Sequence, residues 1–396
     1  MTSRPVRCVI MRGGTSKAVF LREGDIPPEG PARDRVILAV FGSPDQRQID
    51  GLGGADPLTS KLAIIGPPRE AGTDLTYTFG QVEINEPKVD YKSLCGNISA
   101  AVGHYAVHEG LVRAVHPVTM VRVFNTNLNR ILVIEVPVEE DGKPAEEGDY
   151  HIPGVPGSGA RIALDFSGTA GGATGRLLPT ENSVDTITVA GFGKIEASFV
   201  DIGNAHIFVR ARDVGLCGTE STAEIDGNQG LLDLLERIRG AGAALIGMIS
   251  HPDRSRAQSP ATPILGLVSP PAAYTASLTG ELIAAGEVDL VSRLMFMQTT
   301  HKTYAGTSTV CTGVAARIKG SLVQQVLGAD AADRSAINIG HPAGVITTES
   351  VVDWDGSAYQ VRRATFNRTA RRIMEGCVFV PRMACVAGPR ADQEEK

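Results

Sequence analysis

No apolar run in the sequence approaches the roughly 18 residues that a helix needs to cross a bilayer, and residues 1–7 lack the apolar segment of a signal peptide. These two absences predict a cytosolic protein without a membrane partner. Lys and Arg number 38 against 44 Asp and Glu, which gives a formal net charge of −6. The chain has no excess of positive charge, so we expect no nucleic-acid partner.

The cysteines lack the spacing of a metal site or a disulfide framework. There are six of them and eight histidines, with no Cys-x-x-Cys pair. We therefore expect free thiols and no metal. The glycine-rich turn 12–17 also lacks the Gly-Lys-Ser/Thr order of a phosphate loop, and Asp56 stands where the dinucleotide pattern of segment 45–56 needs its third glycine. We expect no cofactor.

The 396 residues suffice for two or three domains with a substantial core. Their pattern predicts two similar halves, because a strand, turn and strand at 199–209 resemble those at 8–21, and an Ala-rich helix opens at Gly306 as one does at Gly96. The flexible segment 168–175 leads us to end the first domain at 182 and to place the second at 183–375, with 376–396 available to pack back on the first. Two facing halves imply a cleft between them.

Hydrophobic periodicity predicts the other elements. We expect a hairpin at 75–84, and turns at 12–17 and 340–344. The expected strands are at 7–11, 18–21, 118–124, 129–137, 161–165, 263–269 and 361–366. The expected helices are at 32–41, in parts of 225–248 and at 286–297.

Cys95 is the first candidate for chemistry. It stands just before Gly96 and Asn97, which open an Ala-rich helix. Unpaired backbone N–H groups and the helix dipole favour an anion at such a position, so we interpret Cys95 as a reactive thiolate rather than as a packing residue. Cys311 lies one turn inside the second helix, and we assign it to the core.

Three further polar groups leave two interpretations open. The hairpin tip 12–17 offers backbone N–H groups, two hydroxyls and two cations to a carboxylate, or is an ordinary turn. Lys61 stands at the beginning of an apolar strand. It is either a base with a lowered pKa or a surface lysine whose charged end reaches the solvent. The third group consists of three arginines near the end of the fold, Arg368, Arg371 and Arg372. They either bind a carboxylate in a bidentate manner or form a solvated or ion-paired face.

Seven motifs in this order and spacing resemble the PrpF family over the chain from about Cys8 to Pro381. They are Met11–Lys17, Gly42–Asp45, Gln48–Gly54, Thr59–Lys61, Cys95–Gly103, Gly340–Pro342 and Arg368–Gly376. That family contains methylaconitate isomerase, methylitaconate delta-isomerase and 4-oxalomesaconate tautomerase. The resemblance implies an α+β, diaminopimelate epimerase-like fold of two pseudo-repeated domains, each a mixed β-sheet wrapped around a central helix, with both helix N-termini at one site.

The resemblance also implies the catalytic pair. Related amino-acid epimerases use one cysteine from each half, and Ala305 stands at the second position here. The family instead pairs a cysteine with a lysine, and the matching residues are Cys95 and Lys61. A neutral Lys61 would remove a weakly acidic allylic proton and return it at the other end of the allyl system. Cys95 would be the partner acid or base, or a group that steers rotation about the transiently single bond.

The function expected is a cofactor-independent isomerase that acts on the C=C bond of a small unsaturated di- or tricarboxylate, such as methylaconitate, methylitaconate or oxalomesaconate. The reaction is an allylic 1,3-proton shift or a cis-trans isomerisation. Two alternatives are an accessory or small-acid binding protein for an aconitase-like enzyme, and an epimerase. Sequence features for the different acids disagree, and the oligomeric state, including a homo-oligomer, stays open. The expected carboxylate-binding residues are Arg12, Thr15, Ser16, Lys17, Ser60, Gly96, Asn97, Asn204, Gly306, Thr307 and Ser308.

Overall fold

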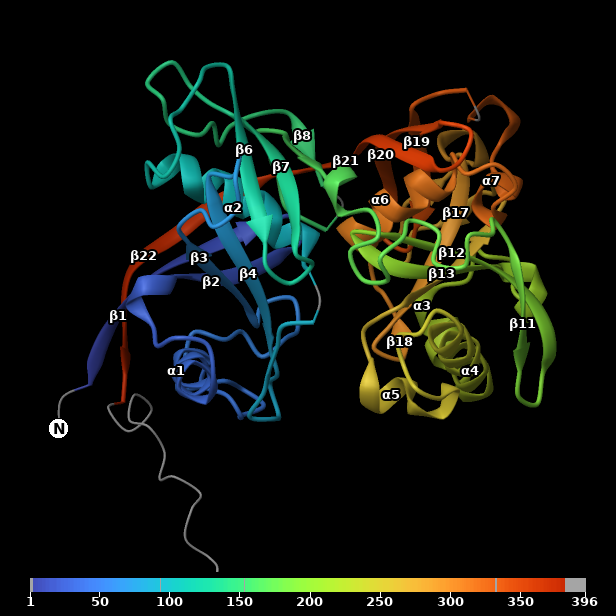
Figure 1. Ribbon diagram of the computed structural model, residues 1–396, viewed down its shortest axis with the longest axis horizontal. Coiled ribbons are helices and arrows are strands. Elements are labelled where there is room, and N and C mark those ends of the chain that lie inside the picture. Colours follow the sequence, from blue (N-terminus) through green and yellow to red (C-terminus); the bar gives the residue numbers. More distant parts are fainter. Residues whose placement is uncertain (1–2, 93, 153, 332, 382–396) are drawn as a thin grey trace, which may run out of the picture.

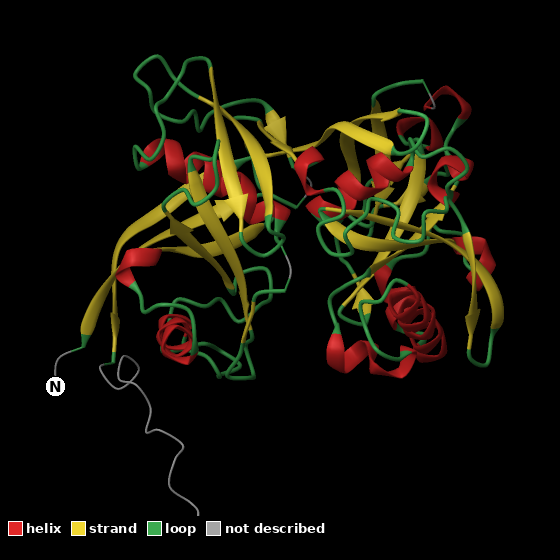
Figure 2. Cartoon of the chain, in the orientation of Figure 1, coloured by secondary structure: helices red, strands yellow, loops and turns green. Residues whose placement is uncertain are grey.

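The computed structural model describes residues 3–381 except 93, 153 and 332. The predicted tail 376–396 therefore lies outside the described residues from 382 onward. Two halves, each of strands wound around a buried helix, lie side by side (Figure 1). The mixture of helices and strands in both halves confirms the predicted α+β class (Figure 2).

The first half contains two main helices and the strands that surround them. In chain order the elements are β1 Arg4–Gly13, β2 Ser16–Arg22, α1 Pro31–Phe41, β3 Lys61–Gly66, β4 Leu75–Val82, β5 Val89–Asp90, α2 Gly96–His108, β6 Val118–Asn125, β7 Arg130–Pro137, β8 Tyr150–His151, β9 Ser158–Gly159 and β10 Ile162–Asp165.

The second half uses the same types of element. In chain order they are β11 Asp185–Val189, β12 Gly193–Ile202, β13 Asn204–Arg210, α3 Thr222–Asp226, α4 Gln229–Leu245, α5 Ser255–Gln258, β14 Ile264–Ser269, β15 Tyr274–Thr275, β16 Leu282–Ile283, β17 Leu290–Phe296, β18 Thr299–Thr300, α6 Gly306–Ala315, α7 Leu322–Val326, β19 Ala336–His341, β20 Gly344–Trp354, β21 Tyr359–Arg368 and β22 Ala370–Val380.

Strand pairing repeats between the halves. In the first half the hairpin β1–β2 continues parallel to β3, antiparallel to β4, parallel to β6 and antiparallel to β7. In the second half the hairpin β12–β13 continues in the same senses to β14, β17, β19 and β20. Helices α2 and α6 occupy the same place in this order, so the repeat predicted from the sequence is confirmed.

The last two strands connect the halves. β21 pairs with β20 on one side and with β10 of the first half on the other. β22 then runs antiparallel to β1 from Ala370, six residues before the predicted return at 376 (Figure 1). The division of the chain at 182 stays a prediction.

Both central helices are buried along their whole length because small side chains dominate them. Every residue of α2 from Gly96 to Val107 and every residue of α6 is buried. A helix that is apolar all round has no solvent face and must be enclosed. One continuous core contains residues of both helices, Ile98 and Val310 among them, and the other faces of the sheets pack on α1 and α4.

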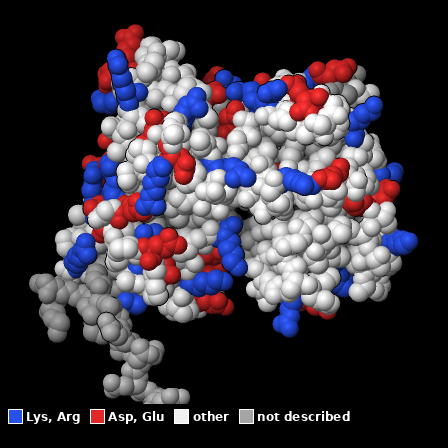
Figure 3. Space-filling view, viewed as in Figure 1, with Lys and Arg blue, Asp and Glu red and all other residues white. Residues whose placement is uncertain are grey.

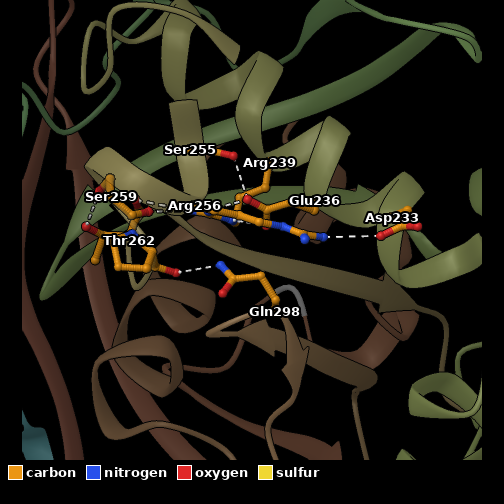
Figure 4. A network of polar contacts seen from close by, with 9 residues as sticks. Asp233, Glu236, Arg239, Ser255, Arg256, Ser259, Thr262 and Gln298 are labelled. Carbon is orange, nitrogen blue, oxygen red and sulfur yellow. Dashed lines mark hydrogen bonds and ion pairs between the residues drawn. The ribbon is translucent and has the colours of Figure 1, made fainter. Parts of the chain in front are cut away.

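A buried ion pair fastens α4 to the loop that leads to β14. Two Arg239 nitrogens donate to the two carboxylate oxygens of Glu236, at 2.8 and 2.6 Å, and a third donates to the carbonyl of Ser259 at 2.8 Å. Ser255 donates its hydroxyl to Glu236 at 2.5 Å (Figure 4). This bidentate geometry satisfies charges that would otherwise be costly to bury.

Two predicted elements are wrong. Segment 286–297 is not a helix, because the seven residues of β17 form a strand that is buried over nearly its whole length. Segment 75–84 is not a hairpin, because β4 runs straight through Gly80. A Cβ on Gly80 would lie 3.0 Å from Val89 and 3.2 Å from Leu62, so this glycine permits close packing rather than a turn.

The remaining predicted helices and strands are confirmed, within a few residues at their ends. Segment 340–344 is the end of β19 and the beginning of β20 with a two-residue turn between them.

Candidate functional site

The N-termini of α2 and α6 meet over one aromatic ring. A Cβ on Gly96 would lie 2.8 Å from Phe366 and 3.4 Å from the carbonyl carbon of Gly306. A Cβ on Gly306 would collide with the same ring. Two glycines are therefore needed where the helices approach each other, and two sets of free backbone N–H groups point into one region.

Each hairpin tip is attached to its helix by a hydrogen bond between an asparagine and a threonine side chain. The amide nitrogen of Asn97 on α2 donates to the Thr15 hydroxyl of the β1–β2 tip at 3.0 Å. The amide nitrogen of Asn204 on the β12–β13 tip donates to the Thr307 hydroxyl of α6 at 2.9 Å. The asparagine and the threonine have exchanged places between the halves, which preserves the contact and places four predicted site residues around the helix N-termini.

Cys95 is the N-cap residue of α2, and its partly buried side chain makes no capping hydrogen bond. Its carbonyl accepts the backbone N–H and the hydroxyl of Ser99, both at 3.0 Å. The Cys95 side chain lies at the positive end of the helix. Ala305 is the N-cap residue of α6, so the second half has no thiol at the matching position.

Lys61 opens β3 directly opposite Gln81 of β4. Its Nζ donates to Oε1 of Gln81 at 2.7 Å and lies 5.3 Å from the centre of the Phe79 ring. The residue is 8% exposed and forms no ion pair among the described residues. The amine is thus hydrogen-bonded to a neutral amide rather than to a carboxylate.

Arg368, at the end of β21, is the main site residue that the sequence-derived list omits. Its Nε donates to Oδ1 of Asn97 at 2.7 Å, one terminal nitrogen donates to the carbonyl of Asn367 at 2.9 Å, and the guanidinium lies 4.6 Å from the Phe366 ring centre. Burial lowers the pKa of Arg368 to about 10. Within the described part of the chain, the other terminal nitrogen of Arg368 has no hydrogen-bond partner. The guanidinium also forms no ion pair with a carboxylate there.

The two other arginines of that motif have different environments. Arg371 is exposed, and Arg372 forms an ion pair with Glu109 at 2.8 Å. The ion-paired interpretation is therefore confirmed for Arg372, whereas a carboxylate clamp by Arg368 stays a prediction. No alternation along the chain singled out Arg368, because positions 364–366 and 368–370 are all buried.

His301, in the loop before α6, is a second residue that the sequence reasoning missed. Its Nδ1 accepts the backbone N–H of Thr303 at 3.1 Å. Burial and the nearby charges of Lys61 and Arg368 hold the pKa of His301 at about 4. The ring is therefore neutral at pH 7, with its proton on Nε2, and serves as a hydrogen-bond donor that adds no charge.

A cavity lies beside Arg368 between the halves. Arg368 and Thr15 are on its wall, and β8, β19, β20 and the loop before α6 supply the rest. Its lining residues are Thr15, Tyr150, His151, Ile152, Thr303, Tyr304, His341, Val345, Ile346, Thr347 and Arg368. A small anion in this space meets one buried cation, several hydroxyls and an apolar wall.

Four other predicted residues, Arg12, Lys17, Ser60 and Ser308, are not on the cavity wall and contact other protein groups instead. Ser60 is fully buried, accepts from Gln48 at 2.8 Å and donates to the carbonyl of Val82 at 2.8 Å, so it supports the turn before Lys61. Arg12 donates to the carbonyl and the hydroxyl of Thr369, at 3.1 and 2.9 Å.

Lys17 and Ser308 also lie away from the cavity wall. Lys17 points toward Gly54 in the loop before β3, where its Nζ would lie 3.5 Å from a Cβ built on that glycine. Ser308 is buried and its hydroxyl lies 2.7 Å from Nε2 of His206. By contrast, buried Ser16 is 3.5 Å from the Asn97 amide and remains at the hairpin tip.

The described residues contain no cluster of His, Cys, Asp and Glu able to hold a metal. Their cysteines are free thiols, and Cys311 is buried in the core as predicted. Cys385 lies outside the described residues. Within the described part of the chain we find no helix with the length and apolar character to cross a bilayer. Charged side chains of both signs are interspersed on the face in Figure 3.

Comparison with protein families shows to which family the chain belongs. The model described as "PrpF protein" matches residues 3–381. The chain belongs to the PrpF family. This PrpF protein is 52% identical to 3-methylitaconate isomerase of Eubacterium barkeri, over 96% of this chain and 98% of that protein. It is 38% identical to 2-methyl-aconitate isomerase of Shewanella oneidensis, over 95% and 97%.

A third relative is 4-oxalomesaconate tautomerase of Pseudomonas putida, at 35% identity over 95% of this chain and 96% of that protein. Among solved structures, methylitaconate-delta-isomerase superposes with a TM-score of 0.86 and 51% identity, covering 98% of this PrpF protein and 99% of that chain. A hydroxyproline epimerase superposes with a TM-score of 0.57 at 11% identity, covering 95% and 93%, which supports the epimerase-like fold alone.

Proposed function

We propose that this PrpF protein is an isomerase that moves a C=C bond within a small unsaturated di- or tricarboxylate. The observation that carries the proposal is Arg368, a buried cation without a carboxylate partner among the described residues, at the meeting point of two helix N-termini. An uncompensated buried charge is costly, and a substrate carboxylate compensates it. The relatives named above are isomerases or tautomerases of unsaturated acids.

The reaction is a proton transfer in two steps. The neutral amine of Lys61 removes a proton from the allylic carbon, and the electron pair spreads over the double bond into the adjacent carboxylate. The resulting dienolate-like charge is stabilised by Arg368 and by the N–H groups at Gly96 and Gly306. The Lys61 ammonium then returns the proton at the other end of the allyl system. Nothing is oxidised or reduced, so the chemistry needs no cofactor.

Cys95 is the proposed partner of Lys61. Its free side chain at the N-terminus of α2 can donate or accept a proton, or guide the transient anion as it rotates. Thr15, Asn97, Asn204 and Thr307 are proposed to hold the carboxylates or to orient the groups that do so. Ser16 is proposed to support Asn97, and Ser60 to support the turn before Lys61, through the contacts described above. Substrate binding by Arg12, Lys17 and Ser308 stays a prediction.

Methylitaconate is the first acid to test, since the relative of 52% identity carries that name. The protein is incubated in D2O with methylitaconate, cis- and trans-methylaconitate and oxalomesaconate, and proton NMR follows deuterium entry and product. We expect one acid to isomerise, and Lys61→Met to slow it at least 100-fold. Gln325→Met, on α7 in the second half, is the control. Isomerisation by Lys61→Met at the wild-type rate would refute Lys61 as the base.

Two other functions remain as outcomes of the same experiment. A binding protein for an aconitase-like enzyme would bind an acid without exchanging deuterium into it. An epimerase would exchange deuterium at a saturated stereocentre and leave the double bond in place. Ala305 at the cap of α6 opposes the epimerase, because that half has no thiol to supply the second acid or base.

A further inference from the structure

Gln81 holds the Lys61 amine in one position. The two residues are paired across β3 and β4, and Nζ of Lys61 lies 2.7 Å from Oε1 of Gln81. The amide nitrogen of Gln81 donates to the carbonyls of Ser60 at 3.0 Å and Pro57 at 3.1 Å. Carbonyls accept only from the NH2 group, so these two bonds fix which end of the amide faces the lysine.

No carboxylate among the described residues forms an ion pair with the amine, and the Asp90 carboxylate of β5 stands opposite Gln81 on the other side of β4. The ring of Phe79 lies 5.3 Å from Nζ, and the two nearby titratable groups of the other half are Arg368, which is positive, and His301, which is neutral. A carboxylate at position 81 would make the same geometric contact, but it would stabilise the ammonium strongly. An amide oxygen aligns the amine without adding that charge.

We infer that Gln81 is the positioning residue of the Lys61 base: it aims the amine and leaves it able to lose its proton. This inference rests on the proposed function, in which Lys61 is the base. It assigns to Gln81 a role that its neighbours on β4 lack, because only Gln81 stands opposite Lys61 in the register.

The first test needs no substrate. Lys61 is labelled competitively with acetic anhydride over a series of pH values, and the labelled peptide is quantified by mass spectrometry. We expect Gln81→Glu to raise the pH of half-maximal Lys61 labelling by at least one unit. Gln325→Glu adds the same charge on α7 in the second half, beside Arg210, and is expected to leave that pH unchanged. Equal titration of Lys61 in wild type and Gln81→Glu would refute the inference.

The second test uses the isomerase assay. We expect Gln81→Glu to move the acidic limb of the kcat/KM profile to higher pH, and Gln81→Met to lower kcat at least 10-fold with little change in KM. Both variants are checked for the wild-type circular dichroism spectrum. A purely structural role would lower the amount of folded enzyme and leave the pH profile in place, which would also refute the inference. Activity retained in Lys61→Met refutes the proposed base, whereas the labelling result speaks only to Gln81.

Discussion

Arg368 and Asn97, 271 residues apart in the chain, are joined by a hydrogen bond of 2.7 Å from the guanidinium Nε to the amide oxygen. The same Asn97 donates its amide nitrogen to Thr15 at 3.0 Å. The strand that connects the halves, the first turn of α2 and the β1–β2 tip thus form one hydrogen-bonded unit. The proposed binding of substrate at Arg368 would therefore depend on all three segments.

Removing the Arg368 charge is expected to weaken substrate binding. Arg368→Met keeps much of the side-chain length but loses the charge-assisted hydrogen bond, worth about 1.5–3 kcal/mol, or roughly 10- to 100-fold in KM. Arg368→Lys keeps the charge but loses the planar fork, so we expect an intermediate KM. Steady-state kinetics with the accepted acid measure both. Equal KM in wild type and Arg368→Met would show that the cation does not meet the substrate.

Cys95 is expected to matter less than Lys61. Cys95→Ala removes a side chain that makes no capping bond, so α2 should keep its stability. If the thiol assists proton transfer, kcat falls by about 10- to 100-fold and KM changes little. Thermal unfolding followed by circular dichroism provides the control. A fall in kcat as large as that of Lys61→Met would make Cys95 an equal partner in the chemistry.

Gly306 is expected to tolerate no side chain. Gly306→Ala places a Cβ within the ring of Phe366, so the α6 N-terminus must shift away from α2. Overpacking of this kind costs about 1–3 kcal/mol of unfolding free energy, and the displaced N–H groups lower kcat as well. Gly286→Ala, at a position with open space around it, is the matched control. Wild-type kcat in Gly306→Ala would show that the helix approach is not needed for catalysis.

The repeat and the two helix N-termini could be predicted because small residues and glycines at Gly96 and Gly306 leave a local signal. Burial on both faces hid other elements. In β17 the apolar residues Leu290 and Val291 are followed by Ser292 and Arg293 and then by apolar residues at 294–296, and this spacing fits a helix as well as a buried strand. The spacing of apolar residues alone does not distinguish a buried strand from a helix.

The same limit explains the site residues. Ser60 looks like a binding hydroxyl in sequence, but its two partners, Gln48 and Val82, are visible only once the loop before β3 is folded. Arg368 looks like Arg371, because the sequence does not show which of them lies between the helix N-termini. The role of Gln81 depends on the β3–β4 register, and the expected hairpin at 75–84 concealed it.

Stability is expected to fall as the pH drops from 7 toward 5. Burial lowers the pKa of His104, His206 and His301 to about 4 and that of His341 to about 3, against 6.5 for an unperturbed histidine. The unfolded chain therefore binds more protons than the folded one between about pH 4 and 6.5, so the unfolding free energy is complete above pH 6.5 and is lost below it.

Urea unfolding at pH 7, 6 and 5 measures this slope. His251→Gln, which alters an exposed histidine, should leave the slope unchanged. His206→Gln should make it shallower, because one proton-binding difference is removed. An unfolding free energy independent of pH between 5 and 7 would contradict the assignment of these histidines as neutral.

The Glu236–Arg239 pair is expected to show the cost of a buried charge without its partner. Arg239→Met leaves the Glu236 carboxylate buried with only the Ser255 hydroxyl, and should lower the unfolding free energy by about 3–5 kcal/mol. The double variant Glu236→Gln/Arg239→Met removes both charges and should recover much of that loss, since a neutral pair has little desolvation cost. Urea unfolding at pH 7 measures all three proteins. Equal stability of the single and double variants would mean that Arg239 acts through its bond to the Ser259 carbonyl rather than through Glu236.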